Sequence, residues 1–322
     1  MGLGRDNFRA KLAKRSAAQE QAAEQRRMDP FLRALKAIHS VSIPDPMDPS
    51  ELDRQRKTQE ILGRLAAPMN GMQWEPFYIG SMDAAWVRVD RIHRRRHAIL
   101  YCHGGGYTSG NLGYSRVLAS KLAAATGYEV LTFEYRLAPE HPYPAAVEDA
   151  QQAWDYLMHQ GYGARDVVLA GDSAGGNLAL VLSLRLRDAG RMLPAALLLL
   201  SPWTDMTISG PSYRDRADID PMLTEAYIRA VREVYAPGAD YASPYLSPLF
   251  ADLAGLPPVL IQVGSHEILY SDAARLHERL DTAGVYNRLE VFEDMWHVFQ
   301  MFPMKKASQA ITDMSHFLLD LS

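Results

Sequence analysis

The sequence predicts an α/β domain built on a mostly parallel sheet with helices on both faces. From about residue 72 onward, short apolar runs alternate with longer stretches of helical periodicity, the pattern of strands joined by crossover helices. The runs are nearly unbroken in Val, Ile, Leu and Ala, as expected for strands buried on both faces. With 322 residues, 48% of them hydrophobic, the chain is long enough for one large domain with an added element.

Each element follows from its local pattern. The expected strands are 73–79 (at an edge of the sheet), 84–89, 98–102, 130–135, 167–170, 195–200, 259–263 and 289–292. Helical periodicity covers 114–126, 143–159, 177–187, 272–283 and 306–321. A long insert, 205–256, separates two core strands and carries a further helix, 224–235.

The first seventy residues have a different character. Residues 1–27 are poor in apolar side chains and hold seven basic against three acidic residues, a balance of +4. We expect a solvated helical extension there, with a membrane-surface or partner-binding helix as the alternative. The proline-rich segment 29–49 then wraps between two expected helices, 32–38 and 51–65.

The strand at 167–170 leads directly into a Gly-x-Ser-x-Gly pentapeptide, residues 171–175, and a helical pattern follows. A serine on such a sharp strand-to-helix turn projects above the sheet edge, and the helix N-terminus behind it supplies unpaired N–H groups. The pentapeptide also occurs as an ordinary turn, but this context favours Ser173 as a nucleophile.

Three glycines follow the third expected strand, in the run His-Gly-Gly-Gly at 103–106. Acyl transfer needs N–H donors aimed at the developing oxyanion, and bare glycine backbone lets a substrate carbonyl approach closely. We expect the N–H groups of Gly104, Gly105 and Ala174 to form this oxyanion hole. A flexible loop or a phosphate cradle is the alternative, but neither phosphate-binding motif is present. His103 is expected to hold the loop in place.

A nucleophilic serine needs a base, and the base needs an acid that orients it. In hydrolases of α/β architecture both follow the serine in the chain. Glu267 comes after the seventh expected strand and His297 after the last, so both reach the same sheet edge as Ser173. We assign Glu267 as the acid and His297 as the base. Asp272 is the rival acid, although its place at a helix start is typical of a capping residue.

These segments together resemble the bacterial branch of the hormone-sensitive-lipase family of esterases, over roughly residues 70–320. The resemblance rests on the glycine run, the pentapeptide with its continuation to Ala179, both triad loops, and the segments 135–146 and 201–203. It implies an α/β-hydrolase fold with Ser173, Glu267 and His297 as the triad. The implied activity is that of a serine carboxylesterase, which cleaves short- to medium-chain esters through an acyl-enzyme without metal or cofactor.

The resemblance also implies a cap over the active site, formed by N-terminal helices and completed by the insert 205–256. We therefore divide the chain into an extension and cap, 1–70, and a catalytic domain, 71–322. Family members often form homodimers through the last strand, here 289–292. Candidate substrate-pocket residues, each of which could equally be core packing, are Tyr107, Trp203, Met206 and Phe299.

Composition excludes several classes of partner. A net charge of −4 and a pI near 6.2 give no reason to expect nucleic acid. No run of eighteen apolar residues exists, so we expect no membrane span, and the N-terminus lacks the apolar core of a signal peptide. The single cysteine, Cys102, precludes an internal disulfide and suits a cytoplasmic location. The expected partner is a small-molecule ester.

Two other functional classes stay open. The fold does not fix the substrate, so the same scaffold could serve an amidase, a lactonase, a carbamate hydrolase or an acyltransferase. A non-catalytic small-molecule receptor is disfavoured, because related receptors lack the catalytic histidine whereas His297 is present here.

Overall fold

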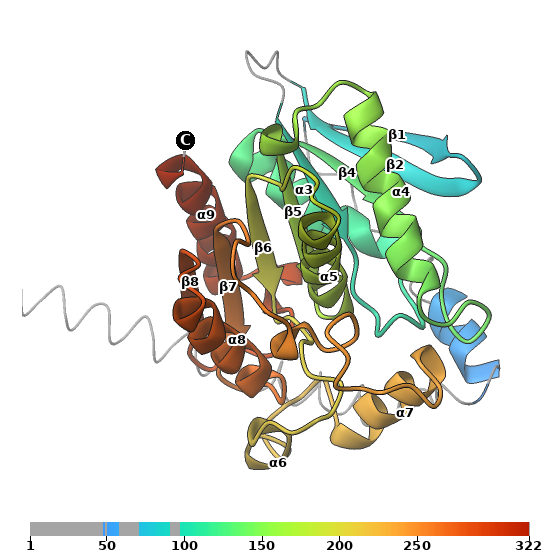
Figure 1. The fold of residues 1–322 in the computed structure, drawn as a ribbon, viewed down its shortest axis with the longest axis vertical. Helices are drawn as coiled ribbons and strands as arrows, with labels where there is room; N and C mark the ends of the chain where they lie inside the picture. Colours follow the sequence, from blue (N-terminus) through green and yellow to red (C-terminus); the bar gives the residue numbers. More distant parts are fainter. Residues whose placement is uncertain (1–47, 49, 58–70, 91–96, 322) are drawn as a thin grey trace, which may run out of the picture. The chain divides into compact units, whose positions relative to one another are not determined.

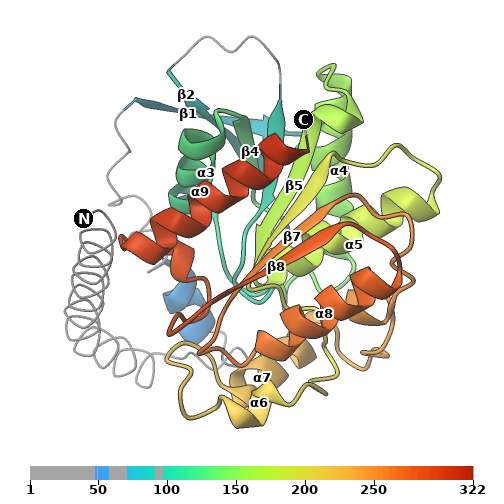
Figure 2. The same cartoon turned by 90° about the vertical axis from the view of Figure 1, so that its left-hand side faces the viewer.

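The computed structural model describes residues 48, 50–57, 71–90 and 97–321. Within these residues the chain forms an eight-stranded sheet with helices on both faces (Figures 1 and 2). The strands are β1 (Met72–Ile79), β2 (Met82–Val89), β3 (Ala98–Cys102), β4 (Glu129–Phe133), β5 (Val167–Asp172), β6 (Ala196–Leu200), β7 (Val259–Gly264) and β8 (Asn287–Phe292). The helices are α3 (Leu112–Thr126), α4 (Ala145–His159), α5 (Ala174–Asp188), α6 (Ser212–Asp215), α7 (Glu225–Tyr235), α8 (Tyr270–Thr282) and α9 (Lys305–Asp320).

The sheet is mostly parallel, as the sequence predicts. Its strand order is β1-β2-β4-β3-β5-β6-β7-β8. Strand β1 pairs antiparallel with β2, and β2 pairs antiparallel with β4, whereas all pairs from β4 to β8 are parallel. The loops that leave β3, β5, β6, β7 and β8 therefore all start at one edge of the sheet, where ligands bind in sheets of this kind.

Apolar layers cover both faces of the sheet. Along β5 the side chains alternate, so that Leu169 lies in the layer with α4, α5 and α8, while Ala170 lies in the layer with α3 and α9. Figure 2 shows α3 and α9 together on one face and α4, α5 and α8 on the other. Burial of the central strands on both faces explains why they are continuous apolar runs in the sequence.

The predicted strands and helices from residue 73 onward are present, with ends shifted by a few residues. Helix α4 starts at Ala145 and not at Tyr143, because a residue that precedes a proline is disfavoured in helical conformation. Helix α5 starts earlier than predicted, at Ala174, because the pentapeptide itself enters the helix.

Only part of the N-terminal extension is described. Residues 50–57 are helical, as expected, and Asp48 caps this helix by accepting the Ser50 N–H on Oδ1 at 2.8 Å. The expected extension 1–27 and helix 32–38 lie outside the described residues, as does the expected helix beyond residue 57.

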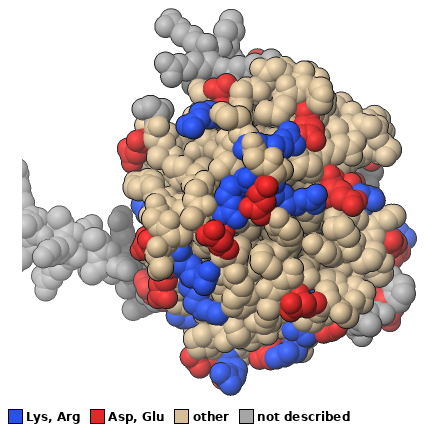
Figure 3. All heavy atoms as spheres, in the orientation of Figure 1, with Lys and Arg blue, Asp and Glu red and all other residues tan. Residues whose placement is uncertain are grey.

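The charged groups on the described surface are mixed in sign. On the face shown in Figure 3, acidic and basic side chains are interspersed among uncharged ones. None of the helices in the described part of the chain combines the length and the apolar content that a bilayer crossing requires.

Candidate active site

Ser173 lies on the turn between β5 and α5, at the carboxyl edge of the sheet. Its φ of 55° and ψ of −120° are sparsely populated for a residue with a side chain, so the turn is strained. Two backbone hydrogen bonds tie it to β6 and the segment after it: the Ser173 N–H donates to the Leu200 carbonyl at 2.9 Å, and the Trp203 N–H donates to the Ser173 carbonyl at 3.1 Å. The serine is thus presented by a fixed elbow, as a nucleophile requires.

The two glycines that flank this elbow are needed for close backbone packing. A Cβ on Gly171 would lie 2.2 Å from the Gly175 carbonyl oxygen, and a Cβ on Gly175 would lie 2.0 Å from the Cys102 carbonyl oxygen. No side chain fits at such distances, because the obstacle is backbone that cannot move aside. The motif glycines therefore let β3, β5 and α5 converge beneath the serine.

Glu267 and His297 come together as the sequence predicts. The Glu267 loop follows β7 and the His297 loop follows β8, and His297 Nδ1 lies 2.9 Å from Glu267 Oε2. The carboxylate is fully buried and the imidazole is 7% exposed. Among the described residues, neither His297 Nε2 nor the Ser173 hydroxyl has a hydrogen-bond partner.

The surroundings of His297 favour its protonated form. Burial of the ring lowers the His297 pKa, but the hydrogen bond and the charge of Glu267, together with the charges of Asp220 and Asp172, outweigh burial and raise the pKa above its usual value. A base that takes up a proton during the reaction benefits from this, since the imidazolium that forms is stabilised.

Asp272, the rival acid, has a different role. It is fully buried in the first turn of α8, and its Oδ2 accepts the N–H groups of Thr204 and Asp205, each at 2.9 Å. Its partners therefore belong to the segment after β6, and it does not cap its own helix. The carboxylate fastens the start of the insert to α8, whereas the imidazole is paired with Glu267.

Ser201 links the acid to the residue that follows the base, a contact that was not predicted from the sequence. It directly follows β6 and has a φ of 46°. Its hydroxyl donates to Glu267 Oε1 at 2.9 Å and accepts the Val298 N–H at 3.1 Å. The Gly264 N–H also donates to Glu267 Oε1, at 2.5 Å. The available signal was the position of Ser201, which follows a strand that ends at the same sheet edge as Ser173.

Asp220 is a second buried group that the sequence analysis missed. It belongs to the insert, and its carboxylate accepts the N–H groups of Ile268 at 2.8 Å and of Met222 at 2.7 Å. Burial raises the Asp220 pKa to about 6, against the opposing effect of these N–H donors and of His297. Asp220 thus joins the insert to the residue next to Glu267.

The oxyanion loop differs from the prediction at one residue. The Gly104 N–H donates to Asp172 Oδ1 at 2.9 Å, so it is already used inside the protein and is not a donor for substrate. The N–H groups of Gly105 and Gly106 have no acceptor among the described residues. The Ala174 N–H belongs to the first turn of α5, which leaves its N–H groups without intrahelical partners. The available donors are therefore Gly105, Gly106 and Ala174; Gly106 was overlooked although it belongs to the same glycine run.

His103 stabilises the loop. Its ring stacks on Tyr135 with centroids 4.1 Å apart, and its Nδ1 lies 2.8 Å from the Gly104 carbonyl oxygen. Burial lowers the His103 pKa to about 4, against the opposing effect of the Gly104 contact. The imidazole is therefore neutral near pH 7, as befits a structural group.

The four candidate pocket residues are core residues. Tyr107, Met206 and Phe299 are fully buried and Trp203 is 1% exposed. Tyr107 stacks on Tyr235 with centroids 3.8 Å apart, and its hydroxyl donates to Asn177 at 2.7 Å. In this structure the four side chains are packed in the protein interior, which is the alternative that the sequence left open.

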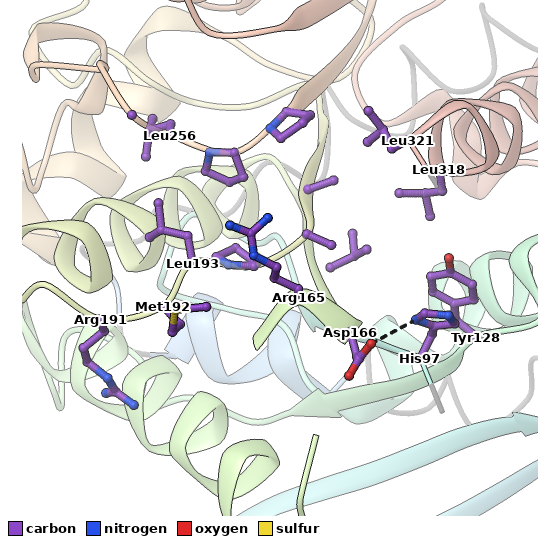
Figure 4. Close-up of a pocket in the computed structure, with 17 residues that line it drawn as sticks. His97, Tyr128, Arg165, Asp166, Arg191, Met192, Leu193, Leu256, Leu318 and Leu321 are labelled. Atoms are coloured by element: carbon purple, nitrogen blue, oxygen red, sulfur yellow. Dashed lines mark ion pairs between the residues drawn. The ribbon is translucent and has the colours of Figure 1, made fainter. Parts of the chain in front are cut away.

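A hollow of about 640 Å³ lies elsewhere on the domain (Figure 4). Its lining includes residues that precede strands, among them His97 before β3, Arg165 before β5 and Pro258 before β7. Ser173 follows the other end of β5, so this hollow lies at the opposite edge of the sheet and is not part of the candidate active site.

Comparison with known proteins agrees with this geometry. A family model described as the α/β hydrolase fold matches residues 99–301. An acetyl-hydrolase of Streptomyces hygroscopicus is 42% identical over 246 residues, which cover 76% of this chain and 80% of that protein.

Solved structures are similar over most of the chain. A crystal structure of an esterase from the bacterial hormone-sensitive lipase family has a TM-score of 0.83 and 37% identity, covering 91% of this chain and 98% of that one. The esterase EstE5, from crystals soaked with p-nitrophenyl butyrate, has a TM-score of 0.80 and 38% identity, covering 84% and 91%.

This chain belongs to the α/β hydrolase fold family, in its bacterial hormone-sensitive-lipase branch. Its activity class is carboxylic ester hydrolysis. The family resemblance and the fold predicted from the sequence are both confirmed.

Proposed function

We propose that Ser173, His297 and Glu267 form a catalytic triad that cleaves carboxylic esters through an acyl-enzyme. The observation that carries this proposal is the 2.9 Å contact between His297 Nδ1 and Glu267 Oε2, at the sheet edge where Ser173 sits on its strained elbow. Nucleophile (Ser173), orienting acid (Glu267) and base (His297) then follow one another along the chain in the order that is typical of this fold.

The reaction has two halves. His297 Nε2 takes the Ser173 proton as Oγ attacks the ester carbonyl carbon, and the N–H groups of Gly105, Gly106 and Ala174 bind the oxyanion. Glu267 keeps the Nδ1 proton in place and stabilises the imidazolium. The alcohol leaves with the proton from His297. Water then attacks the acyl-enzyme with His297 again as base, which releases the carboxylic acid and restores the serine.

The substrates we propose are esters of short- to medium-chain acids. One relative is named an acetyl-hydrolase, and the similar esterase EstE5 was soaked with p-nitrophenyl butyrate. Acetyl and butanoyl groups are both short acyl chains, which supports this choice of substrate.

The cap proposal is supported by contacts around the oxyanion loop. A Cβ on Gly106 would lie 2.7 Å from Val231 of α7, so this helix of the insert packs directly against the glycine run. From the N-terminal side, Arg56 donates to the carbonyl oxygens of Thr108 at 2.8 Å and of Ala138 at 2.7 Å. Both segments are therefore placed to exclude water from the reaction.

We also propose a cytoplasmic homodimer that pairs through β8. This strand ends the sheet, and Val291 on it is 36% exposed, as an edge that pairs with a second copy would be. Sedimentation of Val291→Lys beside the unmodified chain tests the dimer: loss of the dimer is expected, and a monomeric unmodified chain contradicts it. Cell fractionation tests the location.

The triad is tested by mixing purified protein with an activated p-nitrophenyl ester. We expect a burst of nitrophenol followed by steady turnover, and a loss of roughly 10⁴-fold or more in Ser173→Ala and almost as much in His297→Ala. Ser183→Ala is the matched control, since Ser183 is a buried serine of α5, the helix that follows Ser173, and its hydroxyl has no hydrogen-bond partner among the described residues. Near-normal turnover in Ser173→Ala contradicts the proposal. A parallel panel of amides separates esterase from amidase activity.

A further inference from the structure

Asp172, the last residue of β5, is a fully buried carboxylate directly before the proposed nucleophile. Three groups donate hydrogen bonds to it. The Tyr114 hydroxyl reaches Oδ2 at 2.6 Å, the Gly104 N–H reaches Oδ1 at 2.9 Å, and the Tyr101 hydroxyl also binds Oδ1. A buried carboxylate is costly unless such donors surround it. The donors therefore bind β5 to β3, to α3 and to the first glycine of the oxyanion loop.

The contact between Asp172 and Gly104 is too close for any side chain at residue 104. A Cβ there would lie 2.3 Å from Asp172 Oδ2. The chain then turns through Gly105, with a φ of 112°, and Gly106, with a φ of 62°. The turn is closed by the N–H of Thr108, which donates to the Gly105 carbonyl at 3.1 Å. Asp172 therefore holds the first residue of the loop, and the N–H groups without an acceptor follow it immediately.

We propose that Asp172 is a positioning residue of the oxyanion hole, which holds Gly104 so that the N–H groups of Gly105 and Gly106 face the substrate carbonyl. This inference rests on the proposed function. Loss of one oxyanion donor costs about 10²–10³-fold in kcat, and a misplacement of about 1 Å can cost about 10²-fold. Asp172 acts on the rate through the loop, without touching the substrate.

The negative charge of Asp172 also acts on the pKa of His297. This second effect allows an experiment to separate the positioning role of Asp172 from its electrostatic role. The titratable groups that face Asp172 are Tyr101, Cys102, Tyr114, Tyr135 and His297. Its negative charge contributes to the raised His297 pKa, so a neutral replacement lowers that pKa. Asparagine keeps an acceptor oxygen for Gly104 and removes the charge, whereas serine is too short to reach either Gly104 or Tyr114.

The test compares Asp172→Ser, Asp172→Asn and Tyr114→Phe, with kcat and KM for p-nitrophenyl butyrate measured across pH. We expect Asp172→Ser to lower kcat by about 10²-fold with little change in KM. Asp172→Asn should keep most of the kcat that Asp172→Ser loses, and the acid limb of its pH–rate profile should move to lower pH. Tyr114→Phe should lower kcat less than Asp172→Ser does, and the acid limb of its pH–rate profile should not move. Tyr245→Phe is the matched control, because it removes a 2.7 Å tyrosine–aspartate hydrogen bond, to Asp188, outside the site.

An unchanged kcat in Asp172→Ser overturns the inference, and so do equal losses in the serine and asparagine variants. If Asp172→Ser does not fold, Tyr114→Phe decides: a kcat equal to that of the control overturns the inference. Ser173→Ala is run beside them. Turnover in that variant refutes the proposed function itself, whereas an inactive Ser173→Ala with unaffected Asp172 variants refutes only the positioning role.

Discussion

Glu267 and His297 are thirty positions apart in the chain, yet Glu267 Oε2 lies 2.9 Å from His297 Nδ1. The backbone joins their loops: the His266 N–H donates to the Met295 carbonyl at 2.8 Å, and a Cβ on Gly264 would lie 2.3 Å from that same oxygen. The pair is therefore fixed by the scaffold before any substrate arrives, which is the arrangement that preorganised catalysis needs.

Glu267→Gln should lower kcat far more than Asp272→Asn. The amide cannot stabilise the imidazolium or hold the correct tautomer, so a loss approaching 10⁴-fold is expected. Asp272 instead accepts N–H groups of Thr204 and Asp205, and asparagine can still accept them through its amide oxygen. The measurement is the steady-state kcat of both variants. A larger loss in Asp272→Asn than in Glu267→Gln means that Asp272 is the acid.

The pH dependence of kcat/KM should show one limb, rising with pH, set by His297. The imidazole must be neutral to accept the serine proton, and its pKa is raised by Glu267, Asp220 and Asp172, so the midpoint should lie above the ordinary value of about 6.5. Glu267→Gln removes a negative charge, so its limb should move to lower pH. A profile that stays flat down to pH 4 argues against a histidine base.

The sequence predicts those parts of the site that depend on the order of strands. Ser173, Glu267 and His297 each follow a buried strand, and parallel strands bring the loops after them to one edge. The choice of oxyanion donors was only partly predicted, because the acceptor for the Gly104 N–H is Asp172, a side chain 68 positions away. No local pattern records that contact.

The residues of the substrate pocket could not be predicted either, because their environment also depends on residues that are distant in the chain. An aromatic residue beside a glycine run can face either the substrate or the core. For Tyr107 the structure resolves this through Tyr235, which belongs to a different part of the chain and covers its ring. The role of Asp220 likewise depends on Ile268, 48 positions away.

Ser201→Ala should lower kcat by roughly tenfold while the protein stays folded. The change removes one hydrogen bond to the Glu267 carboxylate and one from the Val298 N–H, each worth about 1 kcal/mol or more, and 1.4 kcal/mol corresponds to about tenfold in rate. Kinetics and a melting curve are measured beside Ser183→Ala. A kcat equal to that of the control shows that Ser201 does not position the acid.

The N-terminal segment should affect substrate handling more than chemistry. Deletion of residues 1–27 removes no proposed catalytic group and few apolar residues, so its effect should be mild. Deletion through residue 65 also removes Arg56, whose guanidinium donates to the Thr108 and Ala138 carbonyls and pairs with Glu140 at 2.8 Å. Thr108 belongs to the turn that carries the oxyanion glycines, so the loss should reach the site.

We expect the longer deletion to lower solubility and to flatten the preference for acyl length. The point variant Arg56→Ala should act in the same direction, with a loss of about 1–2 kcal/mol in stability, or roughly 2–8 °C in Tm. Lys57→Ala is the matched control, because Lys57 lies on the same helix and pairs with Asp53 on its surface. The measurement is an acyl-length series on both truncations and both point variants. A chain lacking residues 1–65 that stays soluble and keeps the acyl-length profile of the full-length protein shows that this segment forms no cap over the active site.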